Sequence, residues 1–469
     1  MSASKVDVRP AKLLSSRAYR VPGQLLITEY FFKVPLDHAD PDGEQIRLFC
    51  RAGEKVQNAV VPKEPEYLPW FVYITGGPGF PGRPPQDQPG LTNEVLDRGY
   101  KFLSFDHRGM GLSTPVTADT LMLKGDPEAQ ARYLKLFRAD NAVRDLEAIR
   151  KCLTAEYPAD DDRRKWTVMG QSYGGYVCFT YLSFYPEGLR EAFPLGGTPP
   201  VTALRPDEPI RRLFRKVLER NDLFFAKFPE DKANVQRVAR HIAEHKPTLP
   251  SGVALTPARF LELGIHLGFH GGFDIVHAVV LRAVNDLELF GFLTRPTLTE
   301  FENWPSFDNH PIYALLHGPL YAQGHASNWA FDRVRDEPEF AMFKHKDHQQ
   351  QQQQGQDDVV YFTGEMVFRS VFSDNADLRR VAETAALLES NDDWPPLYDL
   401  DQLRRNTVPV YAAVFVDDMY VDLMFSLETA GLVKNYHMHL TNVMFHDAVR
   451  AKTRDVLKAV FSLRDDTLV

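Results

Sequence analysis

The sequence has few cysteines and no long apolar run, and each shortage argues against a class of protein. Its 469 residues include only 3 cysteines, a small odd number that argues against a disulfide framework and suits a reducing compartment. No stretch of about 18 consecutive apolar residues occurs, so we expect no membrane-spanning helix. The first residues lack the apolar centre of a secretory signal. We therefore expect a cytoplasmic protein that does not enter a membrane.

Positive charge is also in short supply. The chain has 54 Lys and Arg against 63 Asp and Glu, which gives a net charge of -9. An acidic chain has no overall attraction for nucleic acid or for an anionic membrane surface. The Gly-x-Gly-x-x-Gly and P-loop patterns are absent, so nothing in the sequence implies a bound nucleotide. Hydrophobic residues make up 44% of the chain, which is typical of a globular protein.

Strand-like and helix-like segments alternate at both ends of the chain. The β-rich segments 24–32 and 46–50, with a turn at 37–43 between them, predict an antiparallel start to a sheet. Apolar runs bounded by turn residues then predict buried parallel strands, which we place at 70–75, 102–105, 166–169, 193–197, 408–416 and 434–440. Helices are expected at about 141–157, after residue 172, and at about 447–463. This alternation predicts an α/β fold with helices on both faces of a mostly parallel sheet.

The middle of the chain differs from its ends. Residues 199–404 have helical composition without the strand–helix alternation, so we expect an inserted, mainly helical cap domain there. The core would then comprise residues 1–198 and 405–469. Six consecutive glutamines at 349–354 lie beside His345 and His348. We interpret that stretch as a surface insertion, and we expect no metal site in it.

One motif carries the chemistry. Gly170-x-Ser172-x-Gly174 follows an apolar strand and precedes an apolar helix, which is the setting of the nucleophile elbow in α/β-hydrolases. The turn is so tight that only small residues fit two positions on either side of the serine. It raises the serine hydroxyl above the sheet at the start of a helix, where negative charge is stabilised. Ser172 is therefore our candidate nucleophile.

A serine nucleophile also needs two backbone N–H groups that bind the developing oxyanion. One should come from Tyr173, which directly follows the nucleophile. The other should come from the loop after an earlier strand, where the sequence reads Gly-Gly-Pro-Gly at 76–79. Glycine lets a substrate approach the backbone closely, and we choose Gly77.

The remaining partners should follow in the chain order acid, then base. A carboxylate is expected just past a parallel strand, where Asp417 and Asp418 both qualify and Asp422 is further away. His446 follows the next strand and precedes a helix, so it is our candidate base. The other histidines considered fall inside that strand or in the cap: His437, His439, His310, His317 and His325.

Several segments together resemble those of one known family. They are Gly-Gly-Pro-Gly at 76–79, Asp-x-Arg-Gly-x-Gly-x-Ser at 106–113, the elbow at 170–175, Asp-Asp-Met-Tyr-Val at 417–421 and Thr-Asn-x-x-x-His at 441–446. The set resembles the larger, long-cap branch of the proline iminopeptidase (prolyl aminopeptidase) family of α/β-hydrolases, and cap segments such as Phe-Thr-Gly-Glu-Met at 362–366 are also similar. The resemblance selects Asp418, the aspartate before methionine, as the acid.

The family implies a serine peptidase that releases N-terminal proline from peptides and needs no cofactor or metal. An acidic cap residue should bind the charged amine of the substrate, and Glu365 is our candidate. The sequence departs from the family at Thr75, where many relatives have histidine or glutamine, and at Gly318, where a glutamate is expected. If that glutamate binds the substrate amine, this chain lacks part of the anchor.

An esterase, an amidase or a biosynthetic acyl hydrolase on the same scaffold is the alternative, because the cap supplies most of the pocket. In either case we expect a peptide or a small acyl compound as substrate, and neither nucleic acid nor membrane as a partner. The intact set of serine, aspartate and histidine disfavours a binding protein without catalytic activity. The sequence gives no indication of oligomeric state.

Overall fold

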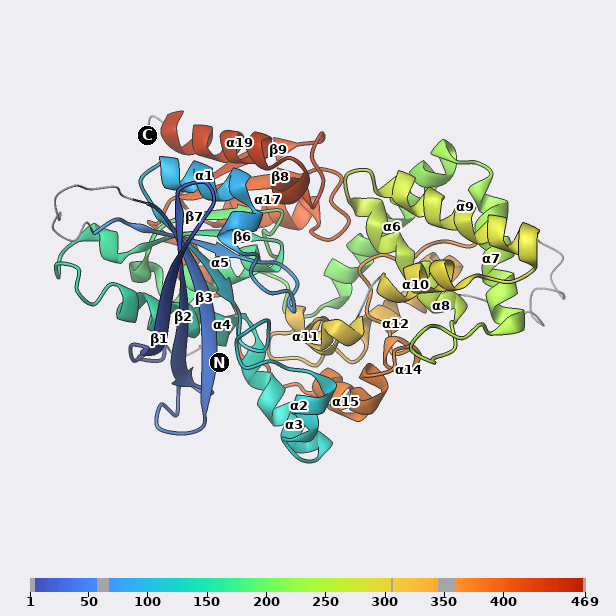
Figure 1. Cartoon of the computed structure of the whole chain (residues 1–469), viewed down its shortest axis with the longest axis horizontal. Coiled ribbons are helices and arrows are strands. Elements are labelled where there is room, and N and C mark those ends of the chain that lie inside the picture. The colour runs from blue at the N-terminus through green and yellow to red at the C-terminus, as the bar shows by residue number, and fades with distance from the viewer. Residues whose placement is uncertain (1–4, 57–66, 305–306, 345–358, 467–469) are drawn as a thin grey trace.

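The computed structural model describes residues 5–56, 67–304, 307–344 and 359–466. The glutamine run at 349–354, together with His345 and His348, lies outside these residues, so the expectations for that stretch are not tested. Figure 1 shows the sheet and its helices in one half of the molecule and the helices α6 to α10 in the other half.

The described residues form one sheet of nine strands. In chain order these are β1 (Lys12–Val21), β2 (Leu25–Pro35), β3 (Gln45–Lys55), β4 (Trp70–Ile74), β5 (Lys101–Asp106), β6 (Trp166–Gln171), β7 (Leu189–Leu195), β8 (Val410–Phe415) and β9 (Tyr436–Thr441). Their order across the sheet is β1-β2-β3-β5-β4-β6-β7-β8-β9. Across the sheet, β1, β2, β3 and β5 pair antiparallel in turn. The strands β5, β4, β6, β7, β8 and β9 pair parallel.

The order of the strands brings distant loops together. The chain passes from β4 to β5 on one side and then returns to add β6 on the other side of β4. Ile74 at the end of β4 therefore pairs with Gly170 near the end of β6. Because the carboxyl ends of parallel strands meet at one edge of the sheet, the loops after β4, β6, β8 and β9 all open there.

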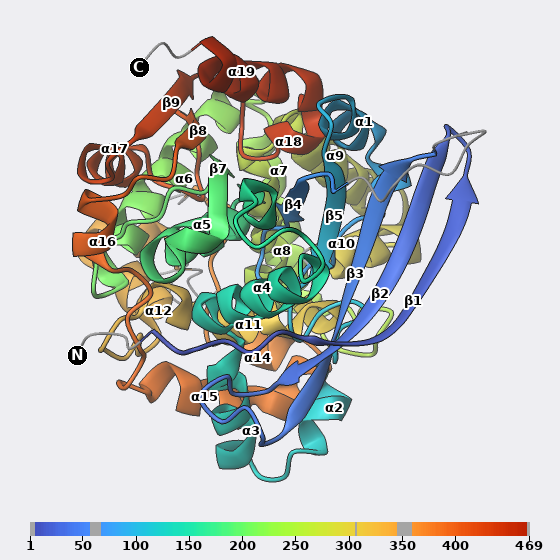
Figure 2. The ribbon, with the colours of Figure 1, turned by 90° about the vertical axis from the view of Figure 1, so that its left-hand side faces the viewer.

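Helices cover both faces of the sheet, as Figure 2 shows. Alternating side chains of β4 divide the core: Val72 packs in one apolar cluster with α4 and α5, and Phe71 packs in another with α1 and α19. The helices of the core are α1 (Pro89–Asp97), α2 (Ala118–Met122), α3 (Pro127–Leu134), α4 (Ala139–Leu153), α5 (Tyr173–Phe184), α17 (Leu423–Leu432), α18 (Ala448–Ala451) and α19 (Thr453–Asp466).

Between β7 and β8 the described residues contain helices and one isolated bridge, Thr248–Ala254. The α-helices are α6 (Asp207–Lys227), α7 (Asp231–His245), α8 (Pro257–Leu261), α9 (Gly272–Phe290), α10 (Arg295–Asn303), α11 (Pro311–Leu316), α12 (Ala330–Arg335), α14 (Val371–Asp374), α15 (Ala382–Ser390) and α16 (Leu400–Arg404). We call this inserted segment the cap. It matches the expected helical insertion, while the boundaries at 198/199 and 404/405 stay a prediction. Among the described helices, none combines the length and apolarity needed to cross a bilayer.

The expected strands are present, with ends displaced by a few residues, and β1 is an addition. The sequence pattern missed β1 because nearly all of its residues are exposed, so it has no buried face to produce an alternation. The expected helix at 141–157 ends earlier, at Leu153. The expected final helix is interrupted at Lys452, which separates α18 from α19.

Candidate active site

Ser172 lies in a strained turn between β6 and α5. Its backbone has φ 55° and ψ -123°, a positive φ that is uncommon for a residue with a side chain. An ideal Cβ on Gly170 would lie 2.1 Å from the Gly174 carbonyl oxygen, and one on Gly174 would lie 2.1 Å from the Ile74 carbonyl oxygen. The glycines of the elbow are therefore required by sterics, as the sequence predicted.

The loops after β8 and β9 bring a carboxylate and an imidazole to this serine. His446 Nε2 lies 2.9 Å from Ser172 Oγ, and His446 Nδ1 lies 2.8 Å from Asp418 Oδ2. The other carboxylate oxygen of Asp418 accepts hydrogen bonds from the backbone N–H groups of Tyr420 at 2.8 Å and Val421 at 3.1 Å. Asp418 and His446 are 2% and 6% exposed, so the pair is shielded from water.

Electrostatics favour a basic His446. Burial disfavours its imidazolium form, but the negative charge of Asp418 and its hydrogen bond outweigh burial, so the pKa of His446 is raised above its usual value. Serine next to an imidazole that a carboxylate orients is the arrangement that activates a hydroxyl for attack on an acyl carbon. The site can therefore perform acyl transfer.

The competing acids and histidines lie elsewhere. Asp417 Oδ1 is 3.8 Å from Lys216 Nζ. Asp422 accepts a hydrogen bond from the backbone N–H of Phe425 at 2.9 Å and so caps α17. Among the described residues, the side chain that hydrogen-bonds Ser172 Oγ is that of His446. His437 and His439 lie within β9, and the remaining candidates lie in the cap: His310, His317 and His325.

The glycine loop after β4 lies against the nucleophile. An ideal Cβ on Gly76 would approach Ser172 Cβ to 2.9 Å, and Gly77 has φ 119°, which favours glycine. Thr75, a departure from the family, donates its hydroxyl to the Phe80 carbonyl at 3.0 Å and so closes the loop. From the cap, His310 Nδ1 lies 2.9 Å from the Gly79 carbonyl oxygen. Gly77 therefore lies in a loop that both the core and the cap hold in place.

Tyr173 is the first residue of α5. The first N–H groups of a helix have no partner within the helix, so the Tyr173 N–H is available to an anion beside Ser172. The roles of the Gly77 and Tyr173 amides as oxyanion donors nevertheless stay a proposal.

The cap supplies a half-buried carboxylate, Glu365, which accepts a hydrogen bond from the Tyr313 hydroxyl. The pKa of Glu365 is raised to about 7, chiefly by burial and further by the negative charge of Asp418, while the positive charge of His446 and the Tyr313 hydrogen bond act in the opposite direction. The charge of Glu365 therefore interacts with both Asp418 and His446. A group with such a pKa changes its charge in the physiological range.

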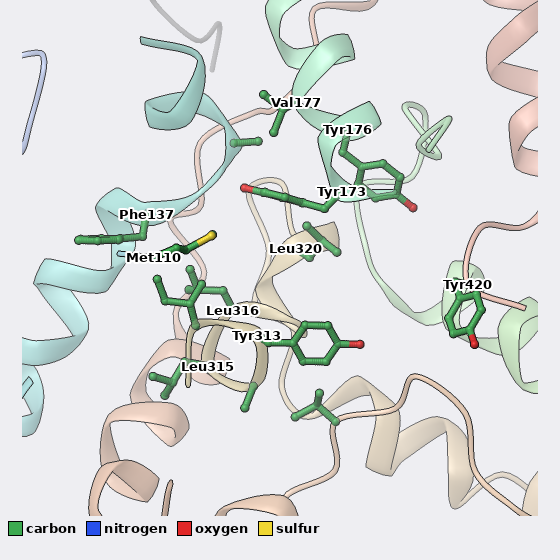
Figure 3. Packing of buried hydrophobic residues seen from close by; sticks show 14 of the residues in the cluster. Met110, Phe137, Tyr173, Tyr176, Val177, Tyr313, Leu315, Leu316, Leu320 and Tyr420 are labelled. Atoms are coloured by element: carbon green, nitrogen blue, oxygen red, sulfur yellow. The ribbon is translucent and has the colours of Figure 1, made fainter. Parts of the chain in front are cut away.

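Three tyrosines interact with the charge of this carboxylate. The negative charge of Glu365 adds to burial in raising the pKa values of Tyr176, Tyr313 and Tyr420. These rings come from α5, from α11 and from the loop after β8, and in Figure 3 the rings of Tyr176 and Tyr313 extend toward the side where Tyr420 lies. The Tyr420 ring also packs on the His446 ring, with centroids 4.4 Å apart. The sequence motif at 417–421 contains Tyr420, but its spacing did not reveal these contacts.

The second departure from the family, Gly318, has no room for a side chain. An ideal Cβ there would lie 2.0 Å from Oε1 of Glu389. The Glu389 carboxylate is held by the Ser327 hydroxyl at 2.6 Å and by the Trp329 N–H at 2.7 Å. Next to Gly318, burial lowers the pKa of His317 to about 4, so this histidine is neutral at neutral pH.

Within the described ranges, one group of side chains brings possible metal ligands together. The ligand atoms of Glu230, Asp231 and His277 all lie within 4.8 Å of one another. Asp231 accepts hydrogen bonds from His277 Nδ1 at 2.8 Å and from Asn234 at 3.1 Å. It is also the first residue of α7, where the helix dipole favours negative charge. These contacts account for Asp231 and His277 without an ion.

Comparison with known proteins agrees with this geometry. The sheet order and the elbow are those of an α/β-hydrolase, and a family model described as the alpha/beta hydrolase fold matches residues 69–285. A proline iminopeptidase of Aspergillus aculeatus (aneH) is 40% identical over 467 residues, which cover 99% of this chain and 100% of the relative. A proline iminopeptidase of Aeromonas sobria is 35% identical and covers 97% and 100%. The chain belongs to the proline iminopeptidase family.

Proposed function

We propose that this protein is a serine aminopeptidase that releases N-terminal proline from peptides. The observation that carries the proposal is the half-buried, ionisable Glu365, whose charge interacts with His446 and Asp418 of the contact chain Ser172–His446–Asp418. A carboxylate that interacts with the catalytic residues suits a substrate in which the N-terminal ammonium belongs to the same residue as the carbonyl carbon that is attacked. The two full-length relatives, which are called proline iminopeptidases, support the same activity.

In the proposed reaction, Ser172 Oγ attacks the carbonyl carbon of the N-terminal residue while His446 Nε2 takes the hydroxyl proton. Asp418 keeps the Nδ1–H tautomer and stabilises the imidazolium. The backbone N–H groups of Gly77 and Tyr173 bind the oxyanion. His446 then returns the proton to the leaving amine, which leaves a prolyl ester on Ser172. Water attacks that ester with His446 again as base, and free proline departs.

Substrate binding in this proposal depends on the cap. The ionised Glu365 carboxylate binds the secondary ammonium of the N-terminal proline, and the faces of Tyr176 and Tyr313 contact its pyrrolidine ring. No cofactor enters the sequence of steps. The unpaired thiols of Cys50, Cys152 and Cys178 support a reducing compartment, so we infer a cytoplasmic location.

The test compares three substrates: proline-naphthylamide, alanine-naphthylamide and a short acyl ester without an amine. We expect proline-selective release that Ser172→Ala abolishes and that Asp418→Asn lowers by about 10⁴-fold. Asp417→Asn is the matched control, because its carboxylate adjoins Asp418 in sequence but contacts Lys216, and its activity should stay near that of the wild type. Ester turnover without proline release would refute the aminopeptidase proposal while leaving the acyl-transfer site intact.

A further inference from the structure

A short stretch of the cap lies against both loops that carry Asp418 and His446. It comprises residues 265–270, which run from the 3₁₀-helix η5 (Glu262–Gly268) to the start of α9, and we call it the cap bridge. On the acid side, the Tyr420 hydroxyl donates a hydrogen bond to the Ile265 carbonyl. An ideal Cβ on Gly268 would lie 2.4 Å from side-chain atoms of Met419 and Tyr420. The cap bridge therefore packs directly on the residues that follow Asp418.

On the base side, His270 contacts both sequence neighbours of His446. Its backbone N–H donates to Asp447 Oδ1 at 2.9 Å, and its ring Nδ1 lies 2.6 Å from the same oxygen. Its ring Nε2 accepts a hydrogen bond from the Phe445 N–H at 3.4 Å. A single side chain of the cap thus contacts the residue before and the residue after His446.

These contacts define one protonation pattern for His270. An Nδ1–H that donates to the Asp447 carboxylate leaves Nε2 as the acceptor for the Phe445 N–H. The ring therefore has both nitrogens engaged in its neutral form. The second carboxylate oxygen of Asp447 lies 3.4 Å from Arg450 Nη2, and the Arg220 guanidinium lies 4.9 Å from the centroid of the Phe445 ring. Arginines on α18 and α6 thus lie next to the two residues that His270 contacts.

The core holds the loop that carries His446 at two other points, since Met444 is buried in the apolar core and Gln171 Nε2 donates to the His446 carbonyl at 3.3 Å. The loop connects β9 to α18, and its residue Val443 is 71% exposed. Its internal hydrogen bonds include Ala448 N–H to the Phe445 carbonyl at 2.9 Å, which turns the chain but does not fix it to the rest of the molecule. The 2.9 Å contact between His446 Nε2 and Ser172 Oγ depends on where this loop lies. A displacement of about 1 Å at such a contact costs about 10²-fold in rate.

We propose that His270 is a positioning residue, which fixes the His446 loop from the cap and thereby sets the geometry of proton transfer from Ser172. The inference rests on the proposed function, since it assigns the base role to His446. It makes the cap part of the apparatus that organises catalysis, in addition to its part in binding substrate. His270 itself touches neither substrate nor the reacting atoms.

The test replaces His270 by Ala and by Asn. Asn places an amide N–H close to the position of Nδ1, so it can still donate to Asp447. The matched control is His277→Ala, which breaks another His–Asp contact in the cap, the 2.8 Å contact of His277 Nδ1 with Asp231 Oδ2. His270→Ala should lower kcat by about 10- to 100-fold with KM changed by less than about threefold. His270→Asn should recover most of kcat, and His277→Ala should match the wild type.

Two readouts separate positioning from loss of folded enzyme. A fluorophosphonate that labels Ser172, followed by intact mass, counts active sites at its end point, and kcat is divided by that count. The initial rate of labelling reports activation of Ser172 by His446 without any need for a proline substrate. It should fall in His270→Ala by about the same factor as kcat. If His270→Ala and His277→Ala have the same kcat and labelling rate per active site, the inference is overturned.

The wild type distinguishes this failure from failure of the proposed function. If the wild type releases no proline but is labelled at Ser172, the aminopeptidase proposal fails, and the His270 comparison is still decided by the labelling rates. If the wild type releases proline and His270→Ala does so equally well per active site, only the inference fails. If His270→Ala does not fold, His270→Asn and Asp447→Asn are compared with the wild type instead. Both variants keep a hydrogen bond between residues 270 and 447, so each should retain more than about a third of wild-type kcat. Loss of about 10-fold or more in both would overturn the proposed rescue and with it the inference.

Discussion

Replacing Tyr313 by Phe removes the hydroxyl that donates to the Glu365 carboxylate. That hydrogen bond lowers the pKa of Glu365, which burial and the other charges leave at about 7 with the hydrogen bond in place. A hydrogen bond to a charged group contributes about 1.5–3 kcal/mol, and one pKa unit corresponds to about 1.4 kcal/mol. The pKa of Glu365 should therefore rise by about 1–2 units in Tyr313→Phe.

The higher pKa should weaken binding of a positively charged substrate. At pH 7 the ionised fraction of Glu365 would fall from about one half to between about one tenth and one hundredth. Since only the carboxylate attracts the substrate ammonium, kcat/KM for proline-naphthylamide should fall by about 5- to 50-fold at that pH. The rising limb of the pH profile should move toward alkaline pH. Its recovery there is limited by the substrate amine, which itself loses its proton near about pH 8.

The assay measures kcat/KM against pH for proline-naphthylamide and for an acyl ester without an amine. The ester has no ammonium for Glu365 to bind, so its profile follows the titration of His446. In Tyr313→Phe that profile should move slightly toward acid pH, because the Glu365 charge is one of the interactions that raise the pKa of His446. Tyr436→Phe is the matched control, because it removes a buried hydroxyl whose partner is Thr198 at 2.8 Å. An unchanged profile for the proline substrate would refute the reasoning, and so would an equal shift with the ester.

Three further predictions concern stability and can be measured by urea unfolding. Ser172→Gly should exceed Ser172→Ala in free energy of unfolding by about 1 kcal/mol, because glycine relieves the positive φ; equal values would contradict the strain. Burial raises the pKa of Glu262 to about 8, whereas the same carboxyl ionises at about pH 4 in the unfolded chain. The free energy of unfolding should therefore fall as the pH rises between these two pKa values. Glu262→Gln should raise the free energy of unfolding by on the order of 3 kcal/mol at pH 7 and flatten this pH dependence. Gly318→Ala should lower the free energy of unfolding by about 1–3 kcal/mol through its clash with Glu389, and by distinctly less when Glu389 is also replaced by Ala. An equal loss of stability in both backgrounds would rule out the clash.

Much of the fold follows from the sequence because most of the parallel strands are buried on both faces. A strand such as β4 is apolar at every position, so its extent is visible without any partner. The carboxyl ends of the parallel strands then locate Ser172, Gly77 and His446, since a parallel sheet brings these ends together. β1 lacks this signal because both its faces are exposed.

The choice between neighbouring residues requires the folded structure. Asp417 and Asp418 follow the same strand, and only the turn of the backbone at the end of β8 directs Asp418 toward His446 while Asp417 faces Lys216. The contact of His270 with Asp447 joins residues 177 positions apart, and no local pattern encodes such a pair. Glu365 was expected from resemblance alone; its high pKa and its hydrogen bond from Tyr313 are properties of the assembled cap.

The absence of a glutamate at position 318 bears on how the substrate is held. Glu389 fills the space beside Gly318, but its carboxylate is bound by Ser327 and by the Trp329 N–H. Glu389 therefore stabilises a turn of the cap. In the proposed reaction this leaves Glu365 as the cap carboxylate whose charge interacts with His446 and Asp418. An enzyme that depends on one carboxylate with a pKa near neutrality should lose affinity for a charged substrate steeply below pH 7. Binding of the amine and proton transfer at His446 would then respond to pH in the same direction, which is why the uncharged ester is needed to separate them.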